Sequence, residues 1–174
     1  MSNSYDDVMA RRSDIMRQAL ALDYDSFQHG DLVFDYDAFM SSTGYRLDDV
    51  ARIQAETKVG HTPLYELHRL TEAVREIAGP GKGAQILLKD EAANASGSFK
   101  ARRASLSAHE AQVKGFAGMV TATSGNYGAA VASQAAQRGL ACIVIQEIYD
   151  SQHVGQPEIV EKSRACEAYG AEVI

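Results

Sequence analysis

The stretch "FAGMVTATSGNYGAAVASQAAQRGLACIVIQE" (residues 116–147) indicates the fold class, because it places one helix between two short apolar strands. "FAGMVTAT" predicts a strand, Tyr127 to Arg138 a helix closed by Gly139, and "ACIVIQE" a second strand. Strands joined in this way by a helix are typical of a parallel pair with a crossover connection. The segment therefore predicts a parallel sheet covered by helices.

The same alternation continues on both sides of this segment. Upstream, "AQILLKDE" (84–91) predicts a strand of the same sheet, and Ser98 to Lys114 predicts a helix with Ser98 as its N-cap. Downstream, Pro157 to Tyr169 predicts a helix with proline in its first turn, and "AEVI" opens another strand. The predicted fold class is α/β, with a parallel sheet flanked by helices.

The first third of the chain has a different pattern. Apolar residues recur at helical spacing from Tyr5 to Leu22 and from Leu47 to Thr57, which predicts amphipathic helices. We therefore expect an N-terminal helical extension over residues 1–60 and part of an α/β catalytic domain over residues 61–174.

Composition excludes several classes of function. The formal net charge of -6 argues against a nucleic-acid surface, which needs clustered Lys and Arg. No segment is typical of a signal peptide or approaches the ~20 apolar residues of a membrane span, so we expect a cytoplasmic protein. The five histidines are scattered and predict no metal site, and Cys142 and Cys166 are expected to be buried, reduced thiols.

Open parallel sheets bind ligands at the carboxyl ends of their strands, where "TSGN" (123–126) follows a predicted strand. Thr123, Ser124, Gly125 and Asn126 present hydroxyls, an amide and backbone N–H groups at a helix N-terminus, where a carboxylate is favoured. The alternative is that Ser124 or Asn126 only caps the helix.

The loop "DEAANASGS" (90–98) leads to Lys100, in the first turn of a predicted helix. A cation at this position is unfavourable, because the helix N-terminus is itself positive. A lysine that condenses with a carbonyl must be uncharged to react, which this position favours. The small neighbouring residues leave room for a planar cofactor. The alternative is a surface lysine beside Arg102 and Arg103.

Three segments together resemble the fold-type II pyridoxal-phosphate enzymes, the tryptophan synthase beta family: "GHTPL" (60–64), "NASGSFKAR" (94–102) and "TSGNYG" (123–128). The resemblance implies that pyridoxal 5'-phosphate is the cofactor, that Lys100 binds it covalently and that Asn126 hydrogen-bonds its 3' oxygen. It also implies that residues 123–126 hold the substrate carboxylate. Ala95 and Ala101 depart from the family's usual Pro and Asp, at positions that perform no chemistry.

Within that family, "YDDVMARRSDIM", "LDYDSF", "SGSFKARRA" and "YDSQHVGQPEIVEKSRACEAYGAEV" are similar to a branch of thiolases that uses coenzyme A. This similarity implies cleavage of 2-amino-4-oxopentanoate, in ornithine degradation, to alanine and acetyl-CoA. It also implies a small alpha subunit as partner, within a homo- or hetero-oligomer.

Other functions stay open at this point. Threonine synthases, ammonia-lyases and cysteine synthases of the same family would share Lys100 and Asn126. A non-catalytic fragment that acts as an interaction protein is a second alternative. A dinucleotide-binding module ranks last, because the GxGxxG fingerprint is absent.

The family's glycine-rich phosphate loop normally lies downstream of the region seen here, and "GPGKGA" (79–84) has neither the Ser/Thr nor the spacing to replace it. It predicts the end of a helix followed by a turn. We therefore expect residues 1–174 to be the N-terminal portion of a longer enzyme, inactive on their own and weak in cofactor binding.

Overall fold

The computed structural model describes residues 4–30, 32–149 and 151–174. Contacts divide the chain into two compact units, residues 1–47 and residues 48–174. Helix α4 (Leu47–Glu56) belongs almost entirely to the second unit, because Arg138 binds both Glu56 and the Ile53 carbonyl oxygen. The division predicted near residue 60 separates the extension from the expected catalytic domain and stays a prediction.

The first unit is built from short elements around a group of aromatic rings. Its elements are α1 (Tyr5–Ala10), α2 (Arg12–Leu20), η1 (Tyr24–Phe27), β1 (Gln28–His29), β2 (Val33–Phe34) and α3 (Tyr36–Ser42). The ring of Phe34 lies 4.4 Å from that of Tyr24 and 4.7 Å from that of Tyr36 between centroids. The first predicted helix is thus two helices that meet at Arg11.

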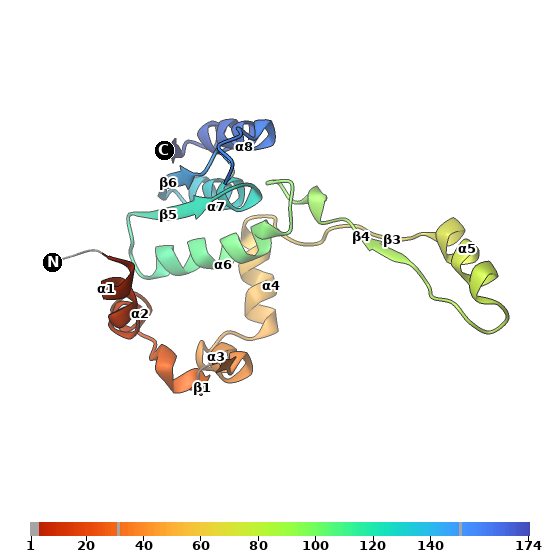
Figure 1. The fold of residues 1–174 in the computed structure, drawn as a ribbon, viewed down its shortest axis with the longest axis horizontal. Coiled ribbons are helices and arrows are strands. Elements are labelled where there is room, and N and C mark those ends of the chain that lie inside the picture. Colours follow the sequence, from red (N-terminus) through yellow and green to blue (C-terminus); the bar gives the residue numbers. More distant parts are fainter. Residues whose placement is uncertain (1–3, 31, 150) are drawn as a thin grey trace. The chain divides into compact units, whose positions relative to one another are not determined.

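The second unit alternates helices and strands as the sequence predicts (Figure 1). Its helices after α4 are α5 (His68–Ala78), η2 (Glu91–Ala93), α6 (Lys100–Val113), α7 (Asn126–Gln137) and α8 (Pro157–Ala168). Its strands are β3 (Leu64–Glu66), β4 (Leu87–Lys89), β5 (Gly118–Thr123), β6 (Ala141–Gln146) and β7 (Glu172–Val173).

Strands β5, β6 and β7 form a parallel sheet in that order, with Thr123 at the end of β5 paired with Gln146 at the end of β6. Helix α7 packs against both β5 and β6 and also against α6 and α8. The predicted parallel sheet flanked by helices is confirmed.

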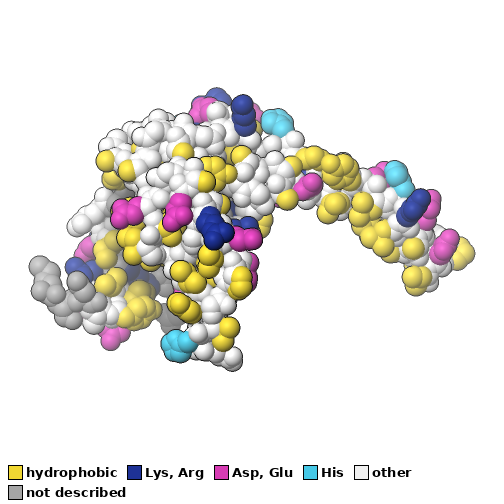
Figure 2. Space-filling model, turned by 90° about the horizontal axis from the view of Figure 1, so that it is seen from above, with side chains coloured by type: hydrophobic (Ala, Val, Ile, Leu, Met, Phe, Trp, Pro, Cys, Tyr) yellow, Lys and Arg dark blue, Asp and Glu magenta, His cyan; other side chains and the backbone are white. Residues whose placement is uncertain are grey.

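One predicted strand of this sheet is placed elsewhere. Strand β4 does not join β5; it pairs antiparallel with β3, with Leu64 opposite Lys89. The connection through α5 and the turn at Gly79–Gly83 reverses the chain, and Leu67 N–H donates to the Ile86 carbonyl oxygen to close the pair. Hydrophobic side chains lie exposed along this segment, as Figure 2 shows.

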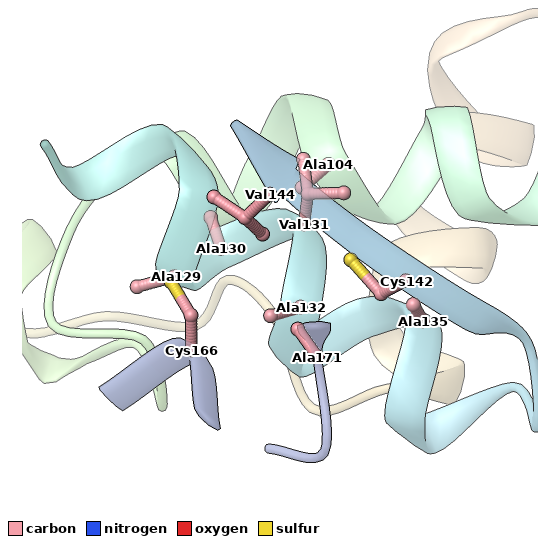
Figure 3. Close-up of a cluster of buried hydrophobic side chains, with 10 residues drawn as sticks. All are labelled: Ala104, Ala129, Ala130, Val131, Ala132, Ala135, Cys142, Val144, Cys166 and Ala171. Carbon is pink, nitrogen blue, oxygen red and sulfur yellow. The ribbon is translucent and has the colours of Figure 1, made fainter. Parts of the chain in front are cut away.

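Small side chains form the core beside the sheet. Figure 3 shows alanines of α6 and α7 around Val144, Cys142 and Cys166. A Cβ atom added at Gly128 would lie 2.5 Å from Cγ2 of Thr123 and 2.9 Å from Cγ1 of Val144. The helix therefore approaches the end of β5 as closely as its alanine-rich sequence predicts, and it fixes where the loop after β5 begins.

Both cysteines are buried and form no disulfide, and burial raises the pKa of each thiol. In the part of the chain that the structure describes, no helix combines the length and apolar character needed to cross a bilayer.

Candidate active site

Lys100 is the first residue of α6, at the end of the loop that contains η2. It is half-buried, and its Nζ lies 4.2 Å from the ring centroid of Phe99. The expected place of Lys100 in the first turn is thus the one observed. The helix carries no acidic residue in its first turn.

Ser98 does not cap α6, contrary to the sequence-based expectation. Helix α6 starts at Lys100, two residues after Ser98, so its N-cap is Phe99. Phe99 makes no side-chain cap hydrogen bond. The hydroxyls of Ser96 and Ser98 are instead buried without a hydrogen-bond partner among the described residues. Since buried polar groups are normally paired, these two hydroxyls, two and four residues before Lys100, are unusual.

An ion pair holds the lysine loop to the helix that it enters. Arg102 donates from Nε and Nη2 to the two carboxylate oxygens of Glu91, at 2.7 and 2.8 Å. Thr62 also donates to Glu91 Oε1, at 2.7 Å. The Arg102 guanidinium and then the Thr62 hydroxyl lower the pKa of Glu91 from 4.5 to about 2, and Glu91 in turn raises the pKa of Arg102.

The same network brings a third segment to the loop. Asn94 is 4% exposed, donates to the Glu91 carboxylate at 3.1 Å and accepts from the Gly60 N–H at 3.0 Å. Gln54 of α4 donates to the Arg102 carbonyl oxygen at 3.2 Å. The "GHTPL" and "NASGSFKAR" segments are therefore joined side chain to backbone, with Lys100 two residues from Arg102.

The second loop, Thr123 to Asn126, has few contacts of its own. Gly125 N–H donates to Thr123 Oγ1 at 3.0 Å, and the N-cap residue of α7 is Gly125, which makes no side-chain cap hydrogen bond. Ser124 and Asn126 are exposed. The capping alternative is therefore not realised, and the N–H groups of the first turn of α7 face a position where an anion is favoured.

The two loops lie at neighbouring helix starts. The Arg103 guanidinium lies 5.0 Å from the ring centroid of Tyr127, so the first turn of α6 contacts the first turn of α7. Tyr169, after α8, donates to the Ala95 carbonyl oxygen of the lysine loop at 3.1 Å. The starts of α6 and α7 thus lie side by side, and the end of α8 contacts the lysine loop through Tyr169.

Comparison with known proteins identifies the family to which this arrangement belongs. A family model described as pyridoxal-phosphate dependent enzyme matches residues 55–174. The chain belongs to this enzyme family. The fold-type II resemblance of the three segments is thereby confirmed.

Two relatives are similar over nearly the whole chain. Both are described as 2-amino-4-ketopentanoate thiolase beta subunit; one, from an unidentified prokaryotic organism, is 60% identical and the other, from Acetoanaerobium sticklandii, 57%. Each alignment covers 98% of this chain and 36% of the relative. The chain thus spans about a third of the length of the curated relatives it matches.

A solved structure supports the fold. The crystal structure of a pyridoxal 5'-phosphate-dependent aspartate racemase is similar over 74% of this chain and 36% of that one, with a TM-score of 0.55 and 28% identity. The parallel sheet with its flanking helices is therefore the arrangement of a fold-type II pyridoxal-phosphate enzyme.

The residues of the site fit pyridoxal phosphate on three observations. Two buried serine hydroxyls without partners lie within four residues of Lys100. A Cβ added at Gly97 or Gly125 would meet nothing within 4 Å, which leaves open space at both loops. The α7 N-terminus has no side-chain cap. Residues 96–100 therefore offer an amine and hydroxyls, and residues 123–126 offer backbone N–H groups, with open space at Gly97 and at Gly125.

The sequence did not predict the ion pair between Glu91 and Arg102, nor the hydrogen bonds that join Glu91 to Thr62 and Asn94. The only sequence signal is that these residues lie in or next to the three family-like segments.

Among the described residues, no group of three or more His, Cys, Asp or Glu side chains is arranged to hold a metal ion.

Proposed function

We propose that this chain is the segment of a pyridoxal-phosphate dependent thiolase beta subunit that carries the cofactor lysine. The complete enzyme would cleave 2-amino-4-oxopentanoate with coenzyme A and release alanine and acetyl-CoA. One observation carries the assignment: identity of 57–60% extends over 98% of the chain, whereas the family match begins at residue 55. The similarity therefore includes the N-terminal unit, which the family match does not cover.

Lys100 would hold the cofactor through Nζ, with Asn126 at its 3' oxygen. When bound, pyridoxal phosphate supplies a carbonyl group for amines and withdraws electrons from the substrate's alpha carbon. Lys100 Nζ, when it is not bound to the cofactor, would accept the proton of that carbon as a general base. The Glu91–Arg102 ion pair keeps the lysine loop in position for this transfer.

The loop Thr123 to Asn126 would bind the substrate carboxylate. Its exposed Ser124 and Asn126 and the uncapped N–H groups of α7 donate to an anion, and the helix dipole favours the negative charge. The carboxylate orients the amino acid, so that the carbon–carbon bond to be cleaved has a fixed direction relative to Lys100.

The partner would be the small alpha subunit, because both close relatives are described as beta subunits. The proposed substrates are an amino acid and coenzyme A, in a homo- or hetero-oligomer located in the cytoplasm.

The test uses the complete beta subunit together with its alpha subunit. With 2-amino-4-oxopentanoate and coenzyme A, we expect equal amounts of alanine and acetyl-CoA, measured by chromatography. Lys100→Ala should lower turnover by about 10³-fold or more and remove the visible absorbance of the bound cofactor. Lys82→Ala, at an exposed lysine of the Gly79–Gly83 turn, is the matched control and should change neither.

Two outcomes would contradict the proposal. Products that form at the same rate without coenzyme A would indicate a lyase or synthase of the same family. A cofactor absorbance that persists in Lys100→Ala would show that another amine binds the cofactor.

A further inference from the structure

An open cavity of about 460 Å³ lies at the carboxyl end of β6, within the size range of small-molecule sites. Its lining residues are Gln146, Glu147, Ile148, Tyr149, Ser151 and His153. We refer to it as the β6 cavity. None of these residues has a part in the site described above, and Asp150 lies outside the described residues.

The β6 cavity adjoins the loop proposed to bind the substrate carboxylate. Gln146 is paired with Thr123 in the register of the parallel sheet, and Glu147 N–H donates to the Thr123 carbonyl oxygen at 3.2 Å. The cavity therefore begins where the neighbouring strand ends, at the edge of the sheet at which α/β enzymes bind their ligands.

The cavity has a fixed floor. Gln146 is 7% exposed, donates to the Ile159 carbonyl oxygen at 3.0 Å and accepts from the Ser163 hydroxyl at 2.6 Å, both on α8. Across the loop, Gln156 N–H donates to the Ile148 carbonyl oxygen at 3.0 Å, next to an isolated bridge between Tyr149 and Gly155. These hydrogen bonds tie the segment after β6 to α8 and across its own loop, which lowers the ordering cost of binding.

The lining favours an uncharged, partly apolar ligand. Tyr149 is 59% exposed and Ile148 36%, so an aromatic ring and an aliphatic chain offer apolar surface to a ligand. The only carboxylate among the six lining residues is Glu147, and they include no Lys or Arg. A phosphate group would find no cation on these walls, whereas an aliphatic amide chain would find both apolar surface and polar groups.

His153 supplies a proton acceptor at this cavity. Its backbone is in the left-handed region, with φ of 61°, which a residue with a side chain rarely adopts. Such a conformation costs free energy and tends to occur at functional sites. A thiol must lose its proton to become a nucleophile, and histidine is the side chain most often used as a general base.

We propose that the β6 cavity binds the uncharged thiol arm of the acyl-accepting co-substrate, with sulfur directed toward the 123–126 loop and His153 as base. This inference rests on the proposed function. The thiol proton passes to His153, sulfur forms a bond to the ketone carbon of the substrate, and the bond from that carbon to carbon 3 breaks. The electron pair left on carbon 3 takes up a proton, so no oxidant or reductant is required.

The first test measures binding of desulfo-coenzyme A, which cannot react, to the complete cofactor-loaded enzyme by calorimetry. Tyr149→Ala should weaken binding about 10-fold, because it removes an aromatic contact surface. The KM for the amino acid and the cofactor absorbance should stay as in the wild type. Tyr149→Ala should weaken the binding of pantetheine, which lacks the nucleotide phosphates, by the same factor if the pantetheine arm occupies the cavity.

The second test separates a base from a contact residue. His153→Gln should lower kcat about 100-fold near neutral pH, with the loss shrinking as pH rises and the thiol ionises unaided. His68→Gln on α5 is the matched control and should leave the pH profile unchanged.

The outcomes separate this inference from the proposed function. A wild-type enzyme that forms no acetyl-CoA overturns the proposed function and, with it, the occupant proposed for the cavity. Acetyl-CoA formation together with unchanged desulfo-coenzyme A binding in Tyr149→Ala and an unchanged pH profile in His153→Gln overturns the inference alone. If either variant fails to fold, as judged by its cofactor absorbance, the other one decides.

Discussion

The two loops of the candidate site differ in how they are held. The lysine loop is fixed by charged and polar side chains from three segments, centred on Glu91 and Arg102. The 123–126 loop is fixed mainly by backbone packing, since Gly128 lets α7 approach β5, while Ser124 and Asn126 remain exposed. Glu91, Asn94 and Arg102 thus bond within the protein, whereas Ser124 and Asn126 of the second loop are exposed.

Substitutions in the two loops should therefore differ in their effects on folding and on binding. Removing a side chain that hydrogen-bonds buried groups lowers stability, because its partners are left unpaired. Removing an exposed donor changes stability little, yet it can lower ligand affinity strongly. The predictions below test whether the two loops divide in this way.

The largest effect on stability is expected from Gly128→Ala. The added methyl group would lie 2.5 Å from Cγ2 of Thr123, so α7 must move away from the sheet. We expect the free energy of unfolding to fall by about 1 to 3 kcal/mol, the usual range for overpacking, as measured by urea denaturation with circular dichroism. Gly125→Ala, which meets nothing within 4 Å, is the control, and an equal loss there would contradict the close-approach argument.

Glu91→Gln should have the next largest effect. It replaces a carboxylate that accepts from Arg102, Thr62 and Asn94, so we expect a loss of about 2 kcal/mol in the free energy of unfolding. Glu161→Gln on the exposed surface of α8 should change it by less than about 0.5 kcal/mol. Similar losses in the two variants would show that the Glu91 network does not hold the lysine loop.

The same residue predicts a pH dependence. Because Arg102 and Thr62 lower the pKa of Glu91 from 4.5 to about 2 in the folded state, its ionised form stabilises the fold above pH 4.5. This contribution is lost as pH falls from 4.5 toward 2. The urea midpoint of the wild type should therefore drop more steeply across this window than that of Glu91→Gln. Parallel pH profiles would refute the assignment.

Local patterns predicted the parallel sheet well, because each strand and helix there is marked by its own residues. Gly139 and Gly170 end their helices with positive φ, and Pro157 begins α8. The alanines of α7 predicted a close helix–sheet contact, and Gly128 shows it.

Long-range pairing could not be predicted in the same way. "AQILLKDE" forms a strand, but its partner β3 is separated from it by α5, and no local signal states which strand it joins. Glu91 lies in η2 and Arg102 in α6, 11 residues apart, and no local pattern states that the two side chains meet. Ser98 has the composition of an N-cap, yet the helix begins later and leaves its hydroxyl buried.

A smaller effect is expected where α8 supports the lysine loop. Tyr169→Phe removes only the hydroxyl that donates to the Ala95 carbonyl oxygen at 3.1 Å. We expect a loss of about 0.5 to 1 kcal/mol in the free energy of unfolding, since the bond is neutral and solvent-exposed. Tyr149, in the β6 cavity, makes no such bond to the lysine loop, so Tyr149→Phe should leave the free energy of unfolding unchanged.

Asn126→Ala should change stability least and binding most clearly. Asn126 is exposed at the start of α7 and makes no cap, so we expect less than about 0.5 kcal/mol change in the free energy of unfolding. In the complete enzyme the KM for the amino acid should nevertheless rise about 10-fold or more, because a charge-assisted hydrogen bond is lost. Glu91→Gln should show the reverse ratio, with the larger effect on unfolding. If Asn126→Ala instead lowered stability as much as Glu91→Gln while KM stayed constant, Asn126 would serve the helix rather than the substrate, and the two loops would not divide their tasks.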